Sequence, residues 1–358
     1  MALSAGSTIG ILGGGQLGRM LAMAAARFSY KVVVFDPDSN APAAQVANAH
    51  IVAGYEDVAA LQAFAKQCNV VTYEFENVPV AAANIIQEIT PVYPKPNALE
   101  AAQDRVTEKS FLNNIGVETA PFHAIDTVQE LADALEAFGG SGILKTRRLG
   151  YDGKGQAALN NASADEAAAT FIALGGKRLI LEGFVPFVAE ISVISARGLD
   201  GAVEAYDPAR NVHREGILAS STLPAGVSMH TTQMALASAK TILTSLDYVG
   251  IIGVEFFVLE SGALLVNEIA PRVHNSGHWT EAACVISQFE QHIRAISGLP
   301  LGNPARHSDC VMENLIGFDV EKVQSLAQES NVYVHLYGKA EPRAGRKMGH
   351  FTRLSSKS

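Results

Sequence analysis

The sequence predicts a multidomain protein of mixed α/β and α+β class, with domains over residues 1–97, 98–300 and 301–358. Three observations lead to this prediction. Strand and helix signals alternate as far as Pro94 and Pro96, and such alternation is typical of a parallel sheet covered by helices. Beyond the prolines, two helical segments give way to short apolar runs that indicate strands and hairpins. Finally, 358 residues that are 48% hydrophobic can bury two or three cores of ordinary size.

The first domain opens with an apolar run at 7–12, a glycine-rich turn and a helix-forming stretch at 19–28. An apolar strand follows at 31–36. The remaining helix and strand signals of this domain alternate through residues 58–67, 70–76, 80–88 and 91–93.

The second domain begins with two expected helices, at 104–114 and 128–138. Its remaining elements are strands at 142–148, 178–185, 190–196 and 203–206, a helix at 236–246, a hairpin of 250–260 with 263–270, and a long amphipathic helix at 280–297. The last domain is small and β-rich, with strands at 310–316 and 332–337 followed by a basic tail.

The charge and hydropathy of the chain exclude several classes of function. A formal net charge of −9 argues against a general nucleic-acid or membrane binder. No apolar run is long enough to span a bilayer, and the first residues lack the basic start and apolar core of a signal peptide. Cys68, Cys284 and Cys310 lie far apart, in no metal-ligand spacing. We therefore expect a cytoplasmic protein with reduced thiols and with no nucleic-acid or membrane partner.

A glycine-rich loop, Gly13-x-Gly15-x-x-Gly18, follows the first strand and opens the first helix, and Asp36 ends the next strand. This pattern fits the dinucleotide-binding fingerprint, so a nicotinamide-dependent dehydrogenase is one interpretation. Its physical content is broader, because glycines let a ligand approach the backbone and a helix N-terminus offers N–H groups to any phosphate. On its own the loop leaves three alternatives open: a dinucleotide, another phosphorylated ligand, or no ligand.

Two glutamates are predicted to face each other across the hairpin. Ser261-Gly262 suits a two-residue turn between apolar strands, because glycine adopts positive φ freely. Counting outward from that turn, Phe257 pairs with Val266 and Glu255 pairs with Glu268. Directly opposed side chains in an antiparallel pair are about 5 Å apart, so the two carboxylates would repel each other.

This repulsion, on an otherwise apolar face, has three resolutions. One glutamate is protonated, an arginine neutralises the pair, or a divalent cation lies between them. Carboxylate oxygens without a histidine or cysteine partner favour Mg²⁺, which usually completes its shell with phosphate oxygens and water. Asn267, adjacent to Glu268, offers another oxygen ligand. The alternative is an exposed edge that carries two solvated glutamates.

A second glycine-rich segment indicates where phosphates would bind. Lys145 lies in a mostly apolar strand, and the loop Gly150-Tyr-Asp-Gly-Lys-Gly-Gln156 that follows can fold over phosphates and offer them N–H groups. The segment Glu182–Val185 ends a strand and can present backbone groups to an adenine edge, and Glu190 can bind ribose hydroxyls. The alternative for Lys145 is an outward-facing lysine on an edge strand.

Segments from near the start of the chain almost to its end match a known family. They are 15–20, 73–77, 104–105, 145–148, 150–156, 211–213, 253–255, 267–272, 274–280 and 345–350. On these residues the chain resembles the ATP-grasp enzymes and, among them, the N5-carboxyaminoimidazole ribonucleotide synthetases, the ATPase subunits of phosphoribosylaminoimidazole carboxylase. Stretches 274–280 and 345–350 are the specific ones. The resemblance implies an ATP-grasp fold preceded by a Rossmann-like pre-ATP-grasp domain.

The resemblance implies an ATP-dependent carbon–nitrogen ligase of purine biosynthesis. ATP, bicarbonate and 5-aminoimidazole ribonucleotide would give N5-carboxyaminoimidazole ribonucleotide, ADP and phosphate by way of carboxyphosphate. The first step is a phosphoryl transfer that needs charge neutralisation, for which Mg²⁺, Lys145 and Arg272 are candidates. Mn²⁺ is the alternative ion, and the implied assembly is a homodimer.

The residue roles that follow are implied by the resemblance. The nucleotide contacts would be Arg105, Lys145, Gly150, Tyr151, Asp152, Gly153, Lys154, Gly155, Gln156, Glu182, Gly183, Phe184, Val185, Glu190, His213, Asn267 and Glu268. The metal ligands would be Glu255, Asn267 and Glu268. The aminoimidazole substrate would contact Gly15, Gln16, Leu17, Glu74 or Glu76, Lys339, Arg346 and Lys347. The catalytic set would be Tyr151, Asp152, Lys154, Arg272, His274 and Asn275.

Within the catalytic set, His274 and Asn275 would position the bicarbonate-derived group, and Asp152 would accept the proton of the substrate amine. The loop Tyr151–Gln156 is the candidate lid that keeps water from the intermediate. Lys154 stands where the family often has arginine, which keeps the charge but not the bidentate geometry. A packing role is the alternative for His274.

Three other functions remain alternatives. A formate-dependent glycinamide ribonucleotide transformylase would share the ATP machinery, but the stretches 274–279 and 346–350 argue against it. A dehydrogenase leaves the Glu255/Glu268 pair and the second glycine loop unexplained. A non-catalytic ATP-grasp scaffold would require a broken site, whereas both glutamates, Lys145 and Arg272 are present.

Overall fold

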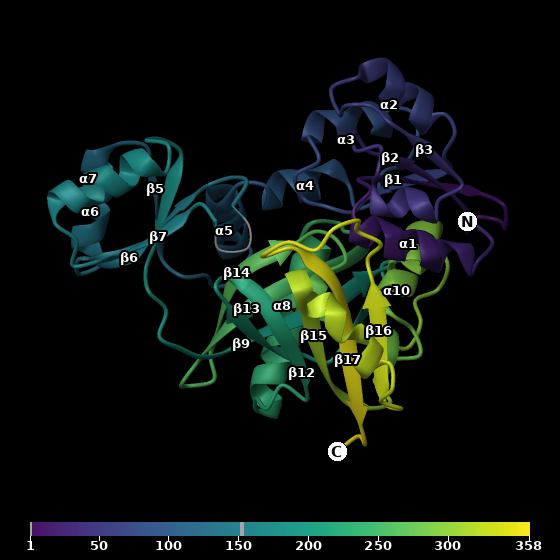
Figure 1. The fold of residues 1–358 in the computed structure, drawn as a ribbon. Helices are drawn as coiled ribbons and strands as arrows, with labels where there is room; N and C mark the ends of the chain where they lie inside the picture. The colour runs from purple at the N-terminus through teal and green to yellow at the C-terminus, as the bar shows by residue number, and fades with distance from the viewer. Residues whose placement is uncertain (1, 151–153) are drawn as a thin grey trace.

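The computed structural model describes residues 2–150 and 154–358, so the candidate site residues Tyr151, Asp152 and Gly153 lie outside the described residues. The chain is organised around three sheets (Figure 1). The N-terminal sheet and a small sheet that carries α6 and α7 lie on opposite sides of the view, and the large sheet lies below them.

The N-terminal sheet is parallel, as the alternating pattern predicted. Its strands are β1 (Thr8–Leu12), β2 (Lys31–Phe35), β3 (Ala49–Ile51) and β4 (Val70–Tyr73), in the order β3-β2-β1-β4. Its helices are α1 (Gln16–Ala26), α2 (Val58–Ala65) and α3 (Val80–Gln87), with a 3₁₀ turn at Pro42–Gln45. The first helix therefore begins three residues earlier than predicted, directly after the glycine loop.

The small sheet is antiparallel and is built from residues 122–182. Its strands are β5 (Phe122–Ile125), β6 (Ser141–Thr146), β7 (Gln156–Asn160) and β8 (Leu179–Glu182), in the order β5-β8-β6-β7. Helices α6 (Val128–Ala137) and α7 (Ala164–Ala173) bury their apolar faces against it. Each helix starts in a capping box, Thr127 with Glu130 and Ser163 with Glu166, which satisfies N–H groups at the helix start.

The large sheet is antiparallel and has nine strands among the described residues. They are β9 (Phe187–Arg197), β10 (Val203–Ala205), β11 (Ala209–Arg214), β12 (Ile217–Leu223), β13 (Gly250–Leu259), β14 (Leu264–Ala270), β15 (Asp309–Ile316), β16 (Val332–Leu336) and β17 (Lys347–Ser355). Their order is β14-β13-β9-β11-β12-β15-β17-β16, with β10 on β9. The C-terminal strands therefore extend the large sheet through the β12–β15 pair.

The remaining helices are short, apart from α8 (Met229–Ser245), which packs on the large sheet. They are α4 (Pro96–Ala102), α5 (Arg105–Asn114), α9 (Thr280–Ala283), α10 (Gln288–Ser297) and α11 (Val323–Leu326), with 3₁₀ turns at Asn275–Gly277 and Gly317–Lys322. Among the described residues, no helix combines the length and apolarity needed to cross a membrane.

The prediction of one long helix at 280–297 was wrong. Cys284 is extended, and its strand-like bridge to Arg306 ends α9. The Ser287 hydroxyl then accepts the N–H of Glu290 and starts α10 as a new helix. An amphipathic pattern that continues through both pieces does not reveal such a break.

The β13–β14 hairpin turns through three residues, Glu260–Gly262, and not through the predicted two. The Gly262 N–H donates to the Leu259 carbonyl and the Leu259 N–H donates to the Ala263 carbonyl, each at 2.9 Å. Gly262 has a φ of +83°, as a type I turn followed by a glycine bulge requires.

The longer turn shifts the strand pairing near it by one position. Phe257 faces Leu265, so its predicted pairing with Val266 was wrong. A β-bulge directly after Glu255 reverses the shift, and Glu255 faces Glu268 as predicted. The prediction missed both the third turn residue and the bulge, and these two errors cancel at the glutamate pair.

Candidate active site

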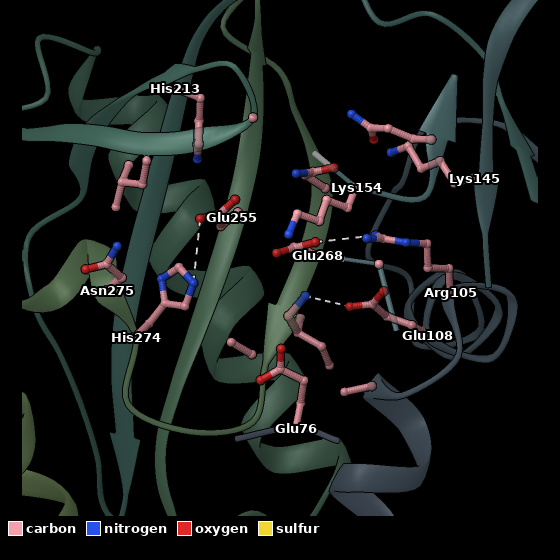
Figure 2. Close-up of a pocket in the computed structure, with 18 of the residues that line it drawn as sticks. Glu76, Arg105, Glu108, Lys145, Lys154, His213, Glu255, Glu268, His274 and Asn275 are labelled. Atoms are coloured by element: carbon pink, nitrogen blue, oxygen red, sulfur yellow. Dashed lines mark hydrogen bonds and ion pairs between the residues drawn. The ribbon is translucent and has the colours of Figure 1, made fainter. Parts of the chain in front are cut away.

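A cavity of about 430 Å³ lies where the three sheets approach one another. Figure 2 shows Glu255 and Glu268 near its centre, with His274 and Asn275 on one side and Arg105 and Lys145 on the other. The predicted site residues that line it are Gln16, Leu17, Glu76, Arg105, Lys145, Gly150, Lys154, Gln156, Glu190, His213, Glu255, Asn267, Glu268, Arg272, His274, Asn275 and Lys347.

The other predicted residues that the structure describes are not in the cavity wall: Gly15, Glu74, Gly155, Glu182, Gly183, Phe184, Val185, Lys339 and Arg346. The Gly183 N–H donates to the Pro121 carbonyl, while the Phe184 side chain is half-exposed. The Lys339 ammonium donates to the Lys347 carbonyl at 2.8 Å. Lys339 therefore lies beside the cavity, next to a residue that lines it.

The N-terminal glycine loop binds two carboxylates of its own chain. The N–H groups of Gly15 and Gly18 donate to the two oxygens of Glu74, at 2.9 and 3.2 Å, and the Gly14 N–H donates to Asp36 at 2.6 Å. Burial raises the pKa of Glu74, and the two glycine N–H groups partly offset this. The donors that a dinucleotide phosphate would need are thus occupied, which argues against the dehydrogenase interpretation.

The repulsion between the two opposed glutamates is reduced by a neighbouring arginine. Arg105 lies 3.4 Å from Glu268 (Nη1 to Oε2). Glu255 is buried, and burial together with the charge of Glu268 raises its pKa to about 7. Of the three predicted resolutions, the structure shows the neighbouring arginine, and the raised pKa of Glu255 makes its protonation easier. Two carboxylates and the Asn267 amide also form an all-oxygen donor set that suits a hard divalent cation.

His274 is held as a neutral ring. Its Nδ1 accepts the N–H of Ser276, so the hydrogen is on Nε2, which lies 3.8 Å from the Glu255 carboxylate. Burial, followed by the charge of Arg272, lowers its pKa to about 3. Because the side chain of His274 is buried yet lines the cavity, its packing and positioning roles do not exclude each other.

Asn275 presents an unsatisfied amide to the cavity. Both its Oδ1 and its Nδ2 are buried, and neither has a hydrogen-bond partner in the described part of the chain. A buried amide without partners costs free energy unless a ligand or water satisfies it.

The adjacent wall carries Arg272, whose Nε lies 2.5 Å from the Glu76 carboxylate. Burial raises the pKa of Glu76, but Arg272 lowers it more, to about 2.

A second polar pair in the cavity wall is His213 with Glu190. His213 Nδ1 lies 3.1 Å from Glu190 Oε2, and both residues line the cavity. Burial lowers the pKa of His213, but the hydrogen bond to Glu190 and the charges of Glu255 and Glu190 together raise it more, so the net shift is upward. Next to them Phe187 and Phe257 stack, with ring centroids 4.7 Å apart, and give this part of the cavity an apolar face.

The sequence prediction missed several lining residues, among them Glu108, Phe187 and Phe257. Burial and the charge of Glu268 raise the pKa of Glu108 to about 8. A signal existed for Glu108, because a charge at the third position after Arg105 lies on the same helix face. No comparable signal marks the two phenylalanines, whose positions in apolar strands are also those of core residues.

Family models match three successive parts of the chain. They describe a ribonucleotide synthetase pre-ATP-grasp domain at residues 6–103, an ATP-grasp domain at 110–289 and a phosphoribosylaminoimidazole carboxylase C-terminal domain at 310–358. The N5-carboxyaminoimidazole ribonucleotide synthase of Brucella melitensis is 59% identical, over 99% of this chain and 98% of the relative. That of Pseudomonas aeruginosa is 43% identical, over 96% of this chain and 93% of the relative.

Solved structures agree with these matches. The Staphylococcus aureus N5-carboxyaminoimidazole synthetase complexed with ADP superimposes with a TM-score of 0.93 at 36% identity, covering 99% of this chain and 94% of that one. The Aspergillus clavatus synthase in complex with ADP and 5-aminoimidazole ribonucleotide gives a TM-score of 0.91 at 31% identity, covering 98% and 94%. The chain belongs to the N5-carboxyaminoimidazole ribonucleotide synthase family.

Proposed function

We propose that the chain is an ATP-dependent ligase that carboxylates 5-aminoimidazole ribonucleotide with bicarbonate in purine biosynthesis, giving ADP and phosphate. The opposed Glu255 and Glu268 carry the proposal, because they share one cavity with Arg105 and Lys145. Two carboxylates beside two cations suit a metal-bound polyphosphate, because the carboxylates hold the metal and the cations neutralise the phosphates. Full-length relatives named as the synthase support the choice of reaction.

The nucleotide would lie between the small and the large sheet. Lys145 and Arg105 would contact its phosphates, and Glu190 with His213 would face the ribose. The apolar face made by Phe187 and Phe257 suits an adenine ring. Glu255, Glu268 and Asn267 would hold Mg²⁺, or Mn²⁺ as the alternative, which supplies charge neutralisation during phosphoryl transfer.

Bicarbonate would bind on the His274 side of the acidic pair. The unsatisfied amide of Asn275 and the Nε2–H of His274 supply donors there, and Arg272 supplies positive charge. These groups would hold carboxyphosphate while the substrate amine attacks its carbonyl carbon and phosphate leaves. The base role of Asp152 and the lid role of loop 151–156 stay predictions.

The aminoimidazole substrate would enter beside Gln16, Leu17, Glu76 and Lys347, which line the N-terminal and C-terminal walls of the cavity. Since Glu74 is engaged with the glycine loop, Glu76 is the better candidate of the two glutamates. We also propose that the chain is cytoplasmic and forms a homodimer. Sedimentation of the purified chain would test the dimer.

The experiment that tests the function measures phosphate release from MgATP and bicarbonate, with and without 5-aminoimidazole ribonucleotide. We expect strong stimulation by the aminoimidazole nucleotide, abolished in Glu268→Gln. Activity with formate and glycinamide ribonucleotide instead would identify the sister transformylase. Tight NAD binding without any ligase activity would overturn the proposal in favour of a dehydrogenase.

A further inference from the structure

Helix α5 directs three charged side chains onto three successive residues of β14. They are Arg105, Glu108 and Lys109, which the helical repeat places on one face. Arg105 reaches the carboxylate of Glu268 at 3.4 Å, and Glu108 accepts the N–H of Ile269 at 2.6 Å (Figure 2). The Lys109 ammonium donates to the Asn267 carbonyl at 3.1 Å. This helix therefore fixes the strand that carries the candidate metal ligands.

Lys109 differs from its two neighbours in its burial. Its side chain is 0% exposed, and it is not in the cavity wall that Arg105 and Glu108 line. Its second contact is Glu182 Oε2 at 3.5 Å, at the end of β8 in the small sheet. An ion as deeply buried as this is retained only with close partners. One ammonium thus joins the large sheet, through Asn267, to the small sheet, through Glu182.

Glu182 lies between two lysines. The same oxygen, Oε2, is 3.0 Å from Lys145 Nζ and 3.5 Å from Lys109 Nζ, while Oε1 has no hydrogen-bond partner among the described residues. Burial raises the pKa of Glu182, but the charges of Lys109 and Lys145 lower it more. Lys145 lines the cavity and Lys109 does not, so only Lys145 can contact a bound phosphate directly.

We propose that Lys109 is a positioning residue for the nucleotide: its buried ammonium neutralises Glu182 and leaves Lys145 available to the polyphosphate. Without Lys109, the attraction of a bare, buried carboxylate would hold Lys145, and the same negative charge would repel the phosphates. The Asn267 contact adds a mechanical role, since it keeps the metal-binding strand in register with the small sheet. This inference rests on the proposed binding of ATP in the cavity.

The test measures ADP binding by calorimetry in the presence of Mg²⁺, with Lys109→Met made in two backgrounds. In the wild-type background we expect about tenfold or greater loss of ADP affinity, the scale of an uncompensated buried charge. In the Glu182→Gln background the carboxylate that Lys109 neutralises is absent, so we expect the same change to cost several-fold less affinity, the remainder being the lost contact with Asn267. Lys240→Met, at an exposed position, is the matched control for loss of a lysine charge.

Steady-state kinetics add a second readout. Lys109→Met should raise KM for ATP and leave KM for the aminoimidazole substrate within about twofold, a split that general loosening of the fold would not give. Equal loss of ADP affinity in both backgrounds, or no loss in the wild-type background, would overturn the proposal. If Lys109→Met does not fold alone, the double variant Lys109→Met/Glu182→Gln still decides, because it removes both the buried ammonium and the carboxylate that it neutralises: ADP affinity near that of Glu182→Gln supports the proposal, and affinity about tenfold lower overturns it. Failure of the wild-type protein to bind ADP would instead reject the proposed function.

Discussion

Among the single residues, Glu74 decides what the first glycine loop does: the loop matches a phosphate-binding pattern, but its N–H groups bind this carboxylate. Glu74 accepts the N–H groups that a phosphate would otherwise take. The carboxylate therefore fixes the loop, and the loop in turn presents Gln16 and Leu17 to the cavity. The sequence could not reveal this, because Glu74 follows β4 and the glycines follow β1, far away in the chain.

Replacing Glu74 should destabilise the N-terminal domain. Glu74→Ala leaves the buried N–H groups of Gly15 and Gly18 without acceptors, so we expect a loss of about 1–3 kcal/mol in the free energy of unfolding. Glu74→Gln keeps one acceptor oxygen and should lose less. Urea unfolding of the two variants makes the comparison, and an alanine variant as stable as the wild type would contradict this account of the loop.

The pH dependence of stability can be argued from His292. Its Nδ1 accepts the Ile251 N–H at 3.1 Å, so Nε2 carries the hydrogen and donates to Thr72 Oγ1 at 2.8 Å. Burial lowers its pKa to about 3 from the ordinary value of 6.5. Between these values the unfolded chain binds a proton that the folded chain does not, so stability falls as the pH drops through this window.

We expect His292→Gln to remove up to about 1.4 kcal/mol per pH unit from the slope of unfolding free energy between pH 6 and pH 4. Urea titrations at several pH values measure this slope, and His307→Gln, at an exposed position, serves as the control. A slope unchanged by the His292 substitution would show that the ring is not kept neutral in the folded state.

The candidate site was predictable where chemistry and spacing coincide. The acidic pair, Lys145 and the 274–275 segment all line one cavity, as the sequence indicated. Contacts such as Lys109 with Glu182 were not predictable, because they depend on how two sheets lie against a helix. The apolar wall of Phe187 and Phe257 was missed because apolar side chains in strands give the same signal in a core and in a ligand site.

At the scale of elements, the β13–β14 hairpin sets the position of the acidic pair. Its three-residue turn requires positive φ at Gly262, where an added Cβ would lie 3.1 Å from Thr231 Oγ1. We expect Gly262→Ala to cost about 1–2 kcal/mol, the penalty for a side chain in the left-handed region. Glu260→Ala, at an exposed position of the same turn, should cost much less.

Thermal unfolding compares these two turn variants, and hydrogen exchange of the β13 and β14 amides localises the effect. Equal stability of the two would mean that the turn does not constrain the hairpin. The strand register itself was predicted only in part, since neither the third turn residue nor the bulge after Glu255 has a distinctive residue signal.

At the scale of the whole molecule, the parallel N-terminal sheet follows from the alternating pattern, whereas the union of the C-terminal strands with the large sheet does not. The β12–β15 pair brings together strands that are far apart in the sequence, and no local pattern specifies such a partner. The division of the chain at residues 97 and 300 stays a prediction.

A buried network attaches these C-terminal strands to the segment after His274. Glu281 on α9 lies 3.0 Å from His335 on β16 and 3.5 Å from His350 on β17. The Tyr337 hydroxyl lies 3.0 Å from His350 Nδ1, and burial raises the pKa of Tyr337, so the hydroxyl keeps its proton. Burial raises the pKa of Glu281, but the two imidazoles lower it more, to about 2, so the carboxylate is charged.

Glu281→Gln should therefore loosen the C-terminal strands, because it removes the negative charge that lies next to both imidazoles. We expect a loss of about 2 kcal/mol in stability, the scale of a hydrogen bond to a charged group. Since β17 begins at Lys347 in the cavity wall, KM for the aminoimidazole substrate should rise while KM for ATP stays unchanged. The matched control is Glu329→Gln, which removes an exposed ion pair with Arg353 on the same strand and should change little. Hydrogen exchange of the β16 and β17 amides should be faster in Glu281→Gln than in the control. Equal exchange in the two variants would show that Glu281 does not hold the C-terminal wall of the cavity.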